Sequence, residues 1–93
     1  MAVNVKIPTP LRTLTNERDT YAGAPGDLND LVAALETEFP GMRERLLDDG
    51  GELRRFVNIY VNGEDVRFLS GLTTAVKDGD EVSIVPAVAG GAR

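Results

Sequence analysis

Few side chains in this sequence could do chemistry by themselves. The 93 residues contain neither histidine nor cysteine. Without cysteine the chain lacks disulfides, thiolate nucleophiles and cysteine-ligated metals, a composition that suits a reducing compartment. Without histidine it lacks the commonest general base, so an enzyme would have to use carboxylates, lysine, tyrosine or hydroxyl groups. The composition therefore predicts that the protein is not an enzyme by itself.

Acidic residues form two groups that resemble sites. Asp78 and Asp80 flank a glycine just before an apolar segment, a pattern far more typical of a turn than of a cation site. Glu36, Glu38 and Glu44 are expected to form solvated helix surface rather than a docking site. We therefore predict no metal site and no bound cofactor.

The last eight residues, "PAVAGGAR", combine an apolar segment with two glycines, Gly90 and Gly91, and two further residues, Ala92 and Arg93. Glycine has no side chain to clash in a narrow site and adopts backbone angles closed to other residues. Taken alone, small residues at a chain end are equally typical of a frayed terminus. We predict a folded domain over 1–86 and a flexible C-terminal tail over 87–93.

Length and charge limit the classes of protein that fit. A chain of 93 residues with 42% hydrophobic residues can bury one modest core. The net charge of −5 argues against binding to nucleic acid or anionic membranes and favours a basic protein partner. The first ten residues lack a charged region followed by a long apolar run, and no apolar stretch in the sequence approaches 18 residues. We therefore expect a soluble, cytoplasmic protein.

The N-terminal half predicts a strand hairpin followed by a helix. Apolar and polar residues alternate over Val3–Ile7, which indicates a strand with one buried face, and a short second strand is expected over Thr20–Ala22. The segment from Leu11 to Ala24, which contains this second strand, is polar. From Asp27, which can cap a helix, apolar residues recur at helical spacing as far as Phe39. Another short helical turn is expected over Met42–Leu47.

The C-terminal half predicts more strands. Val57, Ile59 and Val61 alternate with polar residues and lead into Asn62-Gly63, a dipeptide typical of tight hairpin turns. A crossing segment, a turn over 77–81 and a final strand over 82–85 follow. This order fits an α+β, β-grasp (ubiquitin-like) fold, with a mixed sheet of four to five strands and one main helix packed across one face.

Strand alternation also indicates which side chains face outward. With Val82 and Ile84 directed into the core, Ser83 and Val85 lie on the opposite face, and the same argument places Tyr60 outward. We expect Tyr60 to meet a partner. Val85 could equally be ordinary surface or part of an apolar docking patch.

The stretches "VNIYVNGEDV" and "DGDEVSIVPAVAGG", after a capped helix, resemble the MoaD/ThiS family of ubiquitin-like sulfur carriers, and within it the CysO type that serves cysteine synthesis. This resemblance implies that an ATP-dependent activating enzyme of the MoeB/ThiF kind adenylates a terminal glycine carboxylate. Conversion to a thiocarboxylate then creates the sulfur donor. The resemblance assigns this chemistry to Gly91, preceded by Gly90. Partner contacts are expected along Val85, Pro86, Ala87, Val88 and Ala89, an extended lead-in with small side chains.

Ala92 and Arg93 depart from the family pattern, in which the second glycine is usually terminal. The resemblance predicts a precursor that a JAMM-type metalloprotease cuts after Gly91, whereas trimming by a carboxypeptidase and no processing are the alternatives. It further implies sulfur transfer to an activated serine derivative on a PLP-dependent cysteine synthase. Two other functions stay open: a modifier linked to target lysines, and the small subunit of a molybdopterin-synthase-like complex.

Overall fold

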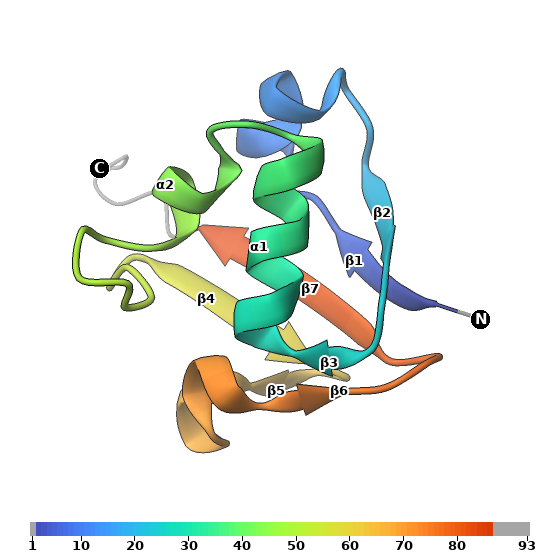
Figure 1. Cartoon of the computed structure of the whole chain (residues 1–93), viewed down its shortest axis with the longest axis vertical. Coiled ribbons are helices and arrows are strands. Elements are labelled where there is room, and N and C mark those ends of the chain that lie inside the picture. The colour runs from blue at the N-terminus through green and yellow to red at the C-terminus, as the bar shows by residue number, and fades with distance from the viewer. Residues whose placement is uncertain (1, 87–93) are drawn as a thin grey trace.

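The computed structural model describes residues 2–86 (Figure 1). The predicted tail therefore lies outside the described residues, and its boundary at residue 86 stays a prediction. In chain order the strands and α-helices are β1 (Val3–Lys6), β2 (Thr20–Gly23), β3 (Gly26–Asp27), α1 (Leu28–Glu38), α2 (Met42–Leu46), β4 (Val57–Val61), β5 (Glu64–Asp65), β6 (Ala75–Val76) and β7 (Glu81–Pro86). Three short 3₁₀ helices span Thr9–Thr15, Val66–Phe68 and Gly71–Thr73.

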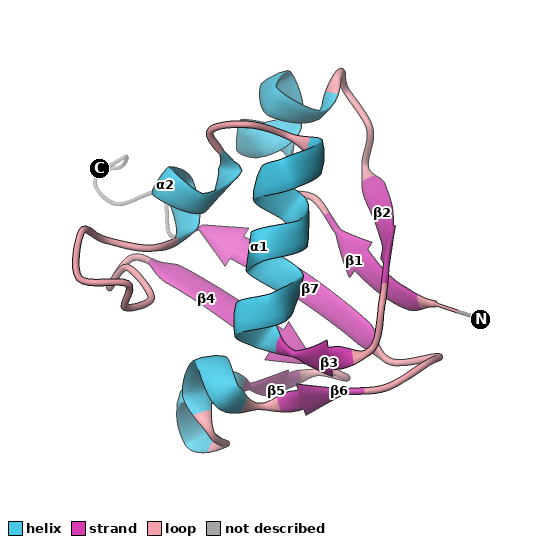
Figure 2. Cartoon of the chain, viewed as in Figure 1, coloured by secondary structure: helices cyan, strands magenta, loops and turns pink. Residues whose placement is uncertain are grey.

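The main sheet has five strands in the order β2-β1-β7-β4-β5, and β3 pairs with β6 in a separate two-stranded sheet (Figure 2). Strands β1 and β7 run parallel, whereas the other pairs of the main sheet are antiparallel. Figure 1 shows α1 lying across one face of this mixed sheet. The predicted β-grasp fold is thus confirmed.

Helix α1 forms as its sequence predicts. The Asp27 side chain accepts a hydrogen bond from the Asp30 backbone N–H at 2.9 Å, which satisfies one of the unpaired N–H groups of the first turn. The buried residues of α1 share one face of the helix: Leu28, Leu31, Val32 and Leu35. The helix ends before the buried Phe39, whose ring meets the Tyr21 ring edge-on at a centroid distance of 5.8 Å.

The core lies between this helix face and the inner face of the sheet. Val3, Val5 and Ile7 are almost completely buried, as are Val57, Ile59 and Val82. Each side chain of this kind contributes about 1.5–3 kcal/mol of favourable transfer free energy when it leaves water. Alternation along the strands therefore fixes which side of β7 faces the helix.

The segment between β1 and β2 contains a helix that was not predicted from the sequence. Thr9–Thr15 is a 3₁₀ helix, and it buries Leu11 and Thr15. The buried Thr15 hydroxyl is satisfied locally, because it lies 2.8 Å from the Arg18 carbonyl oxygen and 3.2 Å from that of Arg12. A polar residue is thus tolerated in the core where its own turn supplies hydrogen-bond acceptors.

The cap of α1 gives a direct test of this local structure. Replacing Asp27 by Ala removes the side-chain acceptor and is expected to lower the free energy of unfolding by about 1 kcal/mol. Asp27→Asn keeps an acceptor oxygen and serves as the control, with a much smaller loss. Urea unfolding followed by circular dichroism measures both. Equal stability of Asp27→Ala and the parent protein would contradict the role of the cap.

Candidate functional site

The C-terminal tail starts from the middle of the main sheet. Strand β7 pairs with β1 through residues 81–83 and with β4 through residues 82–86. Pro86, the last described residue, pairs with Val57 at the start of β4. The predicted site residues Ala87, Val88, Ala89, Gly90 and Gly91 lie outside the described residues, so their roles stay predictions. The described structure fixes the point from which they begin.

The predicted directions of the side chains on β7 are confirmed. Val82 and Ile84 are buried, whereas Val85 is 44% exposed. Val85 lies opposite Asn58 and Ser83 lies opposite Tyr60, so Val85 and Tyr60 share the outer face of two adjacent strands. Tyr60 is half-buried there. The outer face thus presents an apolar side chain near the end of β7 and an aromatic side chain beside its middle.

Sequence reasoning missed Phe56, an exposed aromatic residue near the same point. It precedes Val57, the partner of Pro86, and it is 47% exposed. Among residues 2–86 the other large apolar side chains with comparable or greater exposure are Phe68, Leu69 and Val85. The sequence offered one signal for this exposed residue: Phe56 is an aromatic residue that directly precedes the strand predicted from Val57.

Two turns predicted from sequence are joined to each other in the structure. Asn62 and Gly63 both have positive φ, at 52° and 88°, as the tight β4–β5 turn requires. The Asn62 side chain donates to the Asp80 carboxylate at 3.1 Å and accepts from the Glu81 backbone N–H at 2.9 Å. The hydrogen bond that Asp80 accepts from the Asn62 side chain lowers the pKa of Asp80, and so does a second one from the Lys77 backbone N–H. The predicted turn at Asp78–Asp80 is therefore confirmed, and it anchors the start of β7.

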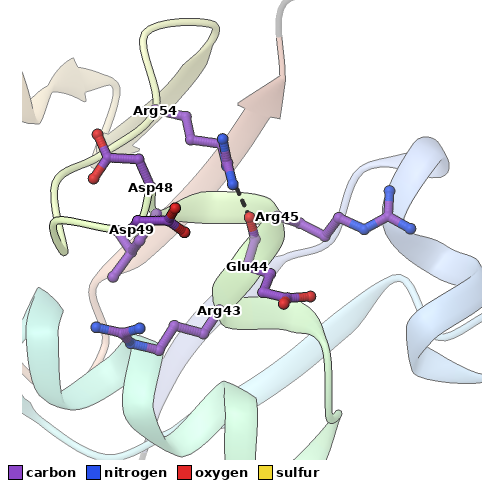
Figure 3. A pocket seen from close by; sticks show the side chains of 7 residues that line it. Arg43, Glu44, Arg45, Asp48, Asp49 and Arg54 are labelled. Atoms are coloured by element: carbon purple, nitrogen blue, oxygen red, sulfur yellow. Dashed lines mark hydrogen bonds between the residues drawn. The ribbon is translucent and has the colours of Figure 1, made fainter.

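A polar hollow of about 550 Å³ opens between α2 and the loop that precedes β4 (Figure 3). In Figure 3 the Arg54 side chain reaches back to α2, where its Nε donates to the Glu44 carbonyl oxygen at 2.8 Å. A neighbouring hollow of about 250 Å³ is lined by Asp48, Arg54, Arg55 and Phe56. Both hollows adjoin the segment that leads into β4, and so lie near the origin of the tail.

Glu36 positions α2 beside this hollow. Its carboxylate accepts hydrogen bonds from the backbone N–H groups of Arg43 at 2.9 Å and Gly41 at 3.2 Å. Both bonds lower the pKa of the Glu36 carboxyl group, and the bond from Arg43 has the larger effect. Glu36 was expected to be solvated helix surface, but it is half-buried and caps the next helix.

Among residues 2–86, no group of three or more His, Cys, Asp or Glu residues is placed to hold a metal ion. No helix in the same part of the chain is long and apolar enough to cross a membrane.

The fold and the placement of β7 define the class of protein. A β-grasp sheet whose central last strand continues toward a Gly-Gly sequence is the arrangement of the ubiquitin-like proteins. The ThiS family model matches residues 5–91, and the chain belongs to this family. The resemblance to MoaD/ThiS proteins, including the CysO type, is thus confirmed.

The relatives include proteins named as carriers and proteins named as modifiers. The sulfur carrier protein CysO of Mycobacterium tuberculosis is 50% identical over 93 residues, which is 98% of this chain and 100% of the relative. Small archaeal modifier protein 3 of Haloferax volcanii is 36% identical, with the same coverage of both chains. In the crystal structure of the Amycolatopsis orientalis BexX/CysO complex, one chain matches with a TM-score of 0.89 and 42% identity, covering 94% of this chain and 97% of that one.

The charge of Glu36 provides a pH-dependent test of α2. Because the folded state lowers the pKa of this carboxyl group, the group contributes stability above its unfolded pKa and loses that contribution as pH falls. Glu36→Gln is expected to be less stable than the parent at pH 7, and the difference should shrink below about pH 4. Urea unfolding at pH 7 and at pH 3 measures this difference in stability.

Glu38→Gln is the matched control for this test, because it removes the same charge from α1 at an exposed position with no such hydrogen bonds among the described residues. A stability difference between Glu36→Gln and the parent that stays constant from pH 7 to pH 3 would show that the carboxylate does not act as this cap.

Proposed function

We propose that the protein is a sulfur carrier whose reacting group is the backbone carboxylate of Gly91. The observation that carries this proposal is the family match, which extends through the Gly-Gly sequence and ends at Gly91. Curated relatives named as sulfur carriers, at 50% and 42% identity, support the same role. The chain itself supplies the carboxylate and a fixed origin for it, and partner enzymes supply the catalytic groups.

The thiocarboxylate forms in two steps, adenylation and attack by sulfide. The Gly91 carboxylate oxygen attacks the α-phosphate of ATP on a MoeB/ThiF-like enzyme, which forms an acyl adenylate and releases pyrophosphate. A hydrosulfide then attacks the acyl carbon, so that a carbon–sulfur bond forms, the bond to AMP breaks and one proton is released. The product is a thiocarboxylate and AMP. Glycine suits this position because neither Gly90 nor Gly91 has a side chain to obstruct a nucleotide site.

Ala92 and Arg93 make the printed sequence a precursor in this proposal. While they are attached, the carbonyl of Gly91 is part of a peptide bond and no carboxylate is available there. Hydrolysis of the bond after Gly91 by a JAMM-type metalloprotease supplies the carboxylate. The thiocarboxylate sulfur then attacks the β-carbon of an activated serine derivative on a PLP-dependent cysteine synthase, so that a carbon–sulfur bond forms and the bond to the activating group breaks. PLP, when bound, would activate the amino acid substrate for this step. Hydrolysis of the bond between Gly91 and the new cysteine then releases the cysteine.

A second candidate function is protein modification through Gly91, and the relatives named as small archaeal modifier proteins favour it. In that case the activated carboxylate forms an amide with a target lysine instead of a thiocarboxylate. The chain has two lysines of its own, Lys6 and Lys77, and Lys6 lies 2.9 Å from the Glu81 carboxylate. Conjugation among copies of the chain therefore has few acceptors.

Intact-mass spectrometry tests the proposal. The full chain and a form ending at Gly91 are incubated with the activating enzyme, ATP and sulfide, with and without the protease. The form ending at Gly91 should gain the mass of one oxygen-to-sulfur exchange. The full chain should do so only after it loses Ala92 and Arg93.

Other outcomes favour other functions. Thiocarboxylation of the full chain without trimming would overturn the precursor step, and an unchanged mass in both forms, while a known carrier is modified, would overturn the carrier function. Amide-linked adducts at Gly91 in cell extracts would favour the modifier. Stable co-purification with a larger subunit would favour the small-subunit function.

A further inference from the structure

The start of β4 carries a group of positively charged side chains that no part of the proposed chemistry uses. Arg54, Arg55, Phe56 and Arg67 surround this point, and we call them the arginine corner. Arg54, Arg55 and Phe56 line one hollow together. Arg67 joins them from the 3₁₀ helix Val66–Phe68, because its guanidinium donates to the Arg54 carbonyl oxygen at 2.7 Å.

The arginine corner lies at the origin of the tail. Phe56 directly precedes Val57, which pairs with Pro86. The second guanidinium nitrogen of Arg67 donates to the Asn58 side chain at 2.7 Å, and Asn58 lies opposite the half-exposed Val85. A protein that takes hold of the tail must therefore approach close to these side chains.

The guanidinium groups of Arg54 and Arg67 are held in place by hydrogen bonds that leave their charges unneutralised. Both partners of the Arg67 guanidinium are neutral oxygens, and the Nε of Arg54 donates to a backbone carbonyl. Asp48 is the one carboxylate that lines the same hollow, and it accepts from the backbone N–H groups of Gly50 and Glu52. Within residues 2–86 the only salt bridge joins Lys6 to Glu81, away from this corner. Guanidinium groups fixed in this way retain N–H donors that fit external carboxylates.

We propose that the arginine corner is a docking surface for an acidic face of the activating enzyme, with Phe56 entering an apolar recess among the partner's carboxylates. This inference rests on the proposed function, because it assumes an enzyme that receives the tail. Arginine and aromatic side chains are the types that carry most binding energy in protein interfaces. The net charge of −5 predicts a basic partner overall, whereas the local charge at the tail calls for acidic residues around its entry.

The length of the tail indicates that the arginine corner contacts a protein surface rather than the phosphates of ATP. Gly91 lies five residues after Pro86, and an extended segment of that length spans up to about 17 Å. When the tail extends into a nucleotide site, the arginines therefore contact the surface around the entrance rather than the nucleotide.

Charge reversal at Arg55 tests the proposal with a matched control. The structure shows no hydrogen bond from the Arg55 side chain to residues 2–86, so Arg55→Glu reverses the charge without breaking an internal hydrogen bond. Lys77→Glu makes the same change of charge in the exposed turn before β7, at the other end of that strand. Phe56→Ser removes the aromatic side chain while leaving the charge unchanged. Circular dichroism verifies that each variant is folded.

ATP–pyrophosphate exchange by the activating enzyme is measured against the concentration of carrier ending at Gly91. For Arg55→Glu we expect a roughly tenfold increase in the KM for the carrier with kcat unchanged, because docking contributes equally to the ground and transition states. Phe56→Ser should also raise this KM, whereas Lys77→Glu should leave it within about twofold of the parent. Raising ionic strength should reduce the difference between Arg55→Glu and the parent.

Two outcomes would overturn the proposal. An equal KM for Arg55→Glu and Lys77→Glu would remove the docking role, and an increased KM for ATP alone would assign the arginines to the nucleotide. If the parent itself is not adenylated, the proposed function fails. Isothermal titration of the full chain and the same variants against the activating enzyme without ATP then tests the docking surface separately, with weaker binding of Arg55→Glu than of Lys77→Glu as the expected result.

Discussion

The pairing of β7 with β1 on one side and β4 on the other is the constraint on which the rest of the structure depends. It brings the first and last strands of residues 2–86 together at the centre of the main sheet. Because side chains alternate along a strand, this pairing also commits Val82 and Ile84 to the core beneath α1. A shift of one residue in the register of β7 would expose both of them and bury Val85. The origin of the tail is therefore fixed by the same contacts that hold the core together.

In this arrangement the stability of the folded domain and the reactivity of the proposed terminal group depend on different parts of the chain. The described domain is built from ordinary apolar packing, with Asn62 and Asp80 tying the β4–β5 turn to the loop before β7. The proposed reacting group is a backbone carboxylate, so no side chain of the core has to be compromised for chemistry. In the proposed function, a chain without histidine or cysteine takes part in sulfur transfer because its partners supply the activation, the sulfur nucleophile and the acceptor.

The periodicity of apolar residues was enough to predict β1, α1, β4 and β7, and the Asn62-Gly63 and Asp78–Asp80 turns followed from local turn chemistry. The 3₁₀ helix Thr9–Thr15 was not predicted, since its buried threonine depends on acceptors that only its folded turn supplies. The arginine corner was also missed. Arg67 is 13 positions from Arg54, and only the path of the chain after β5 brings its guanidinium to the Arg54 carbonyl oxygen. Local pattern reveals the elements, but it does not reveal contacts between side chains that the topology brings together.

The distribution of charge argues for a division of roles over the surface. A net charge of −5 disfavours phosphate backbones and sets the long-range field of the molecule, which is attractive to basic proteins. At the range of direct contact the field of individual groups dominates, because about 8–10 Å of salt solution screens more distant charges. Beside the end of β7 those groups are guanidiniums with neutral internal partners. An enzyme surface that is basic at a distance and acidic at its tail entrance would match both levels, so orientation at the tail is decided by the arginine corner rather than by the net charge of the domain.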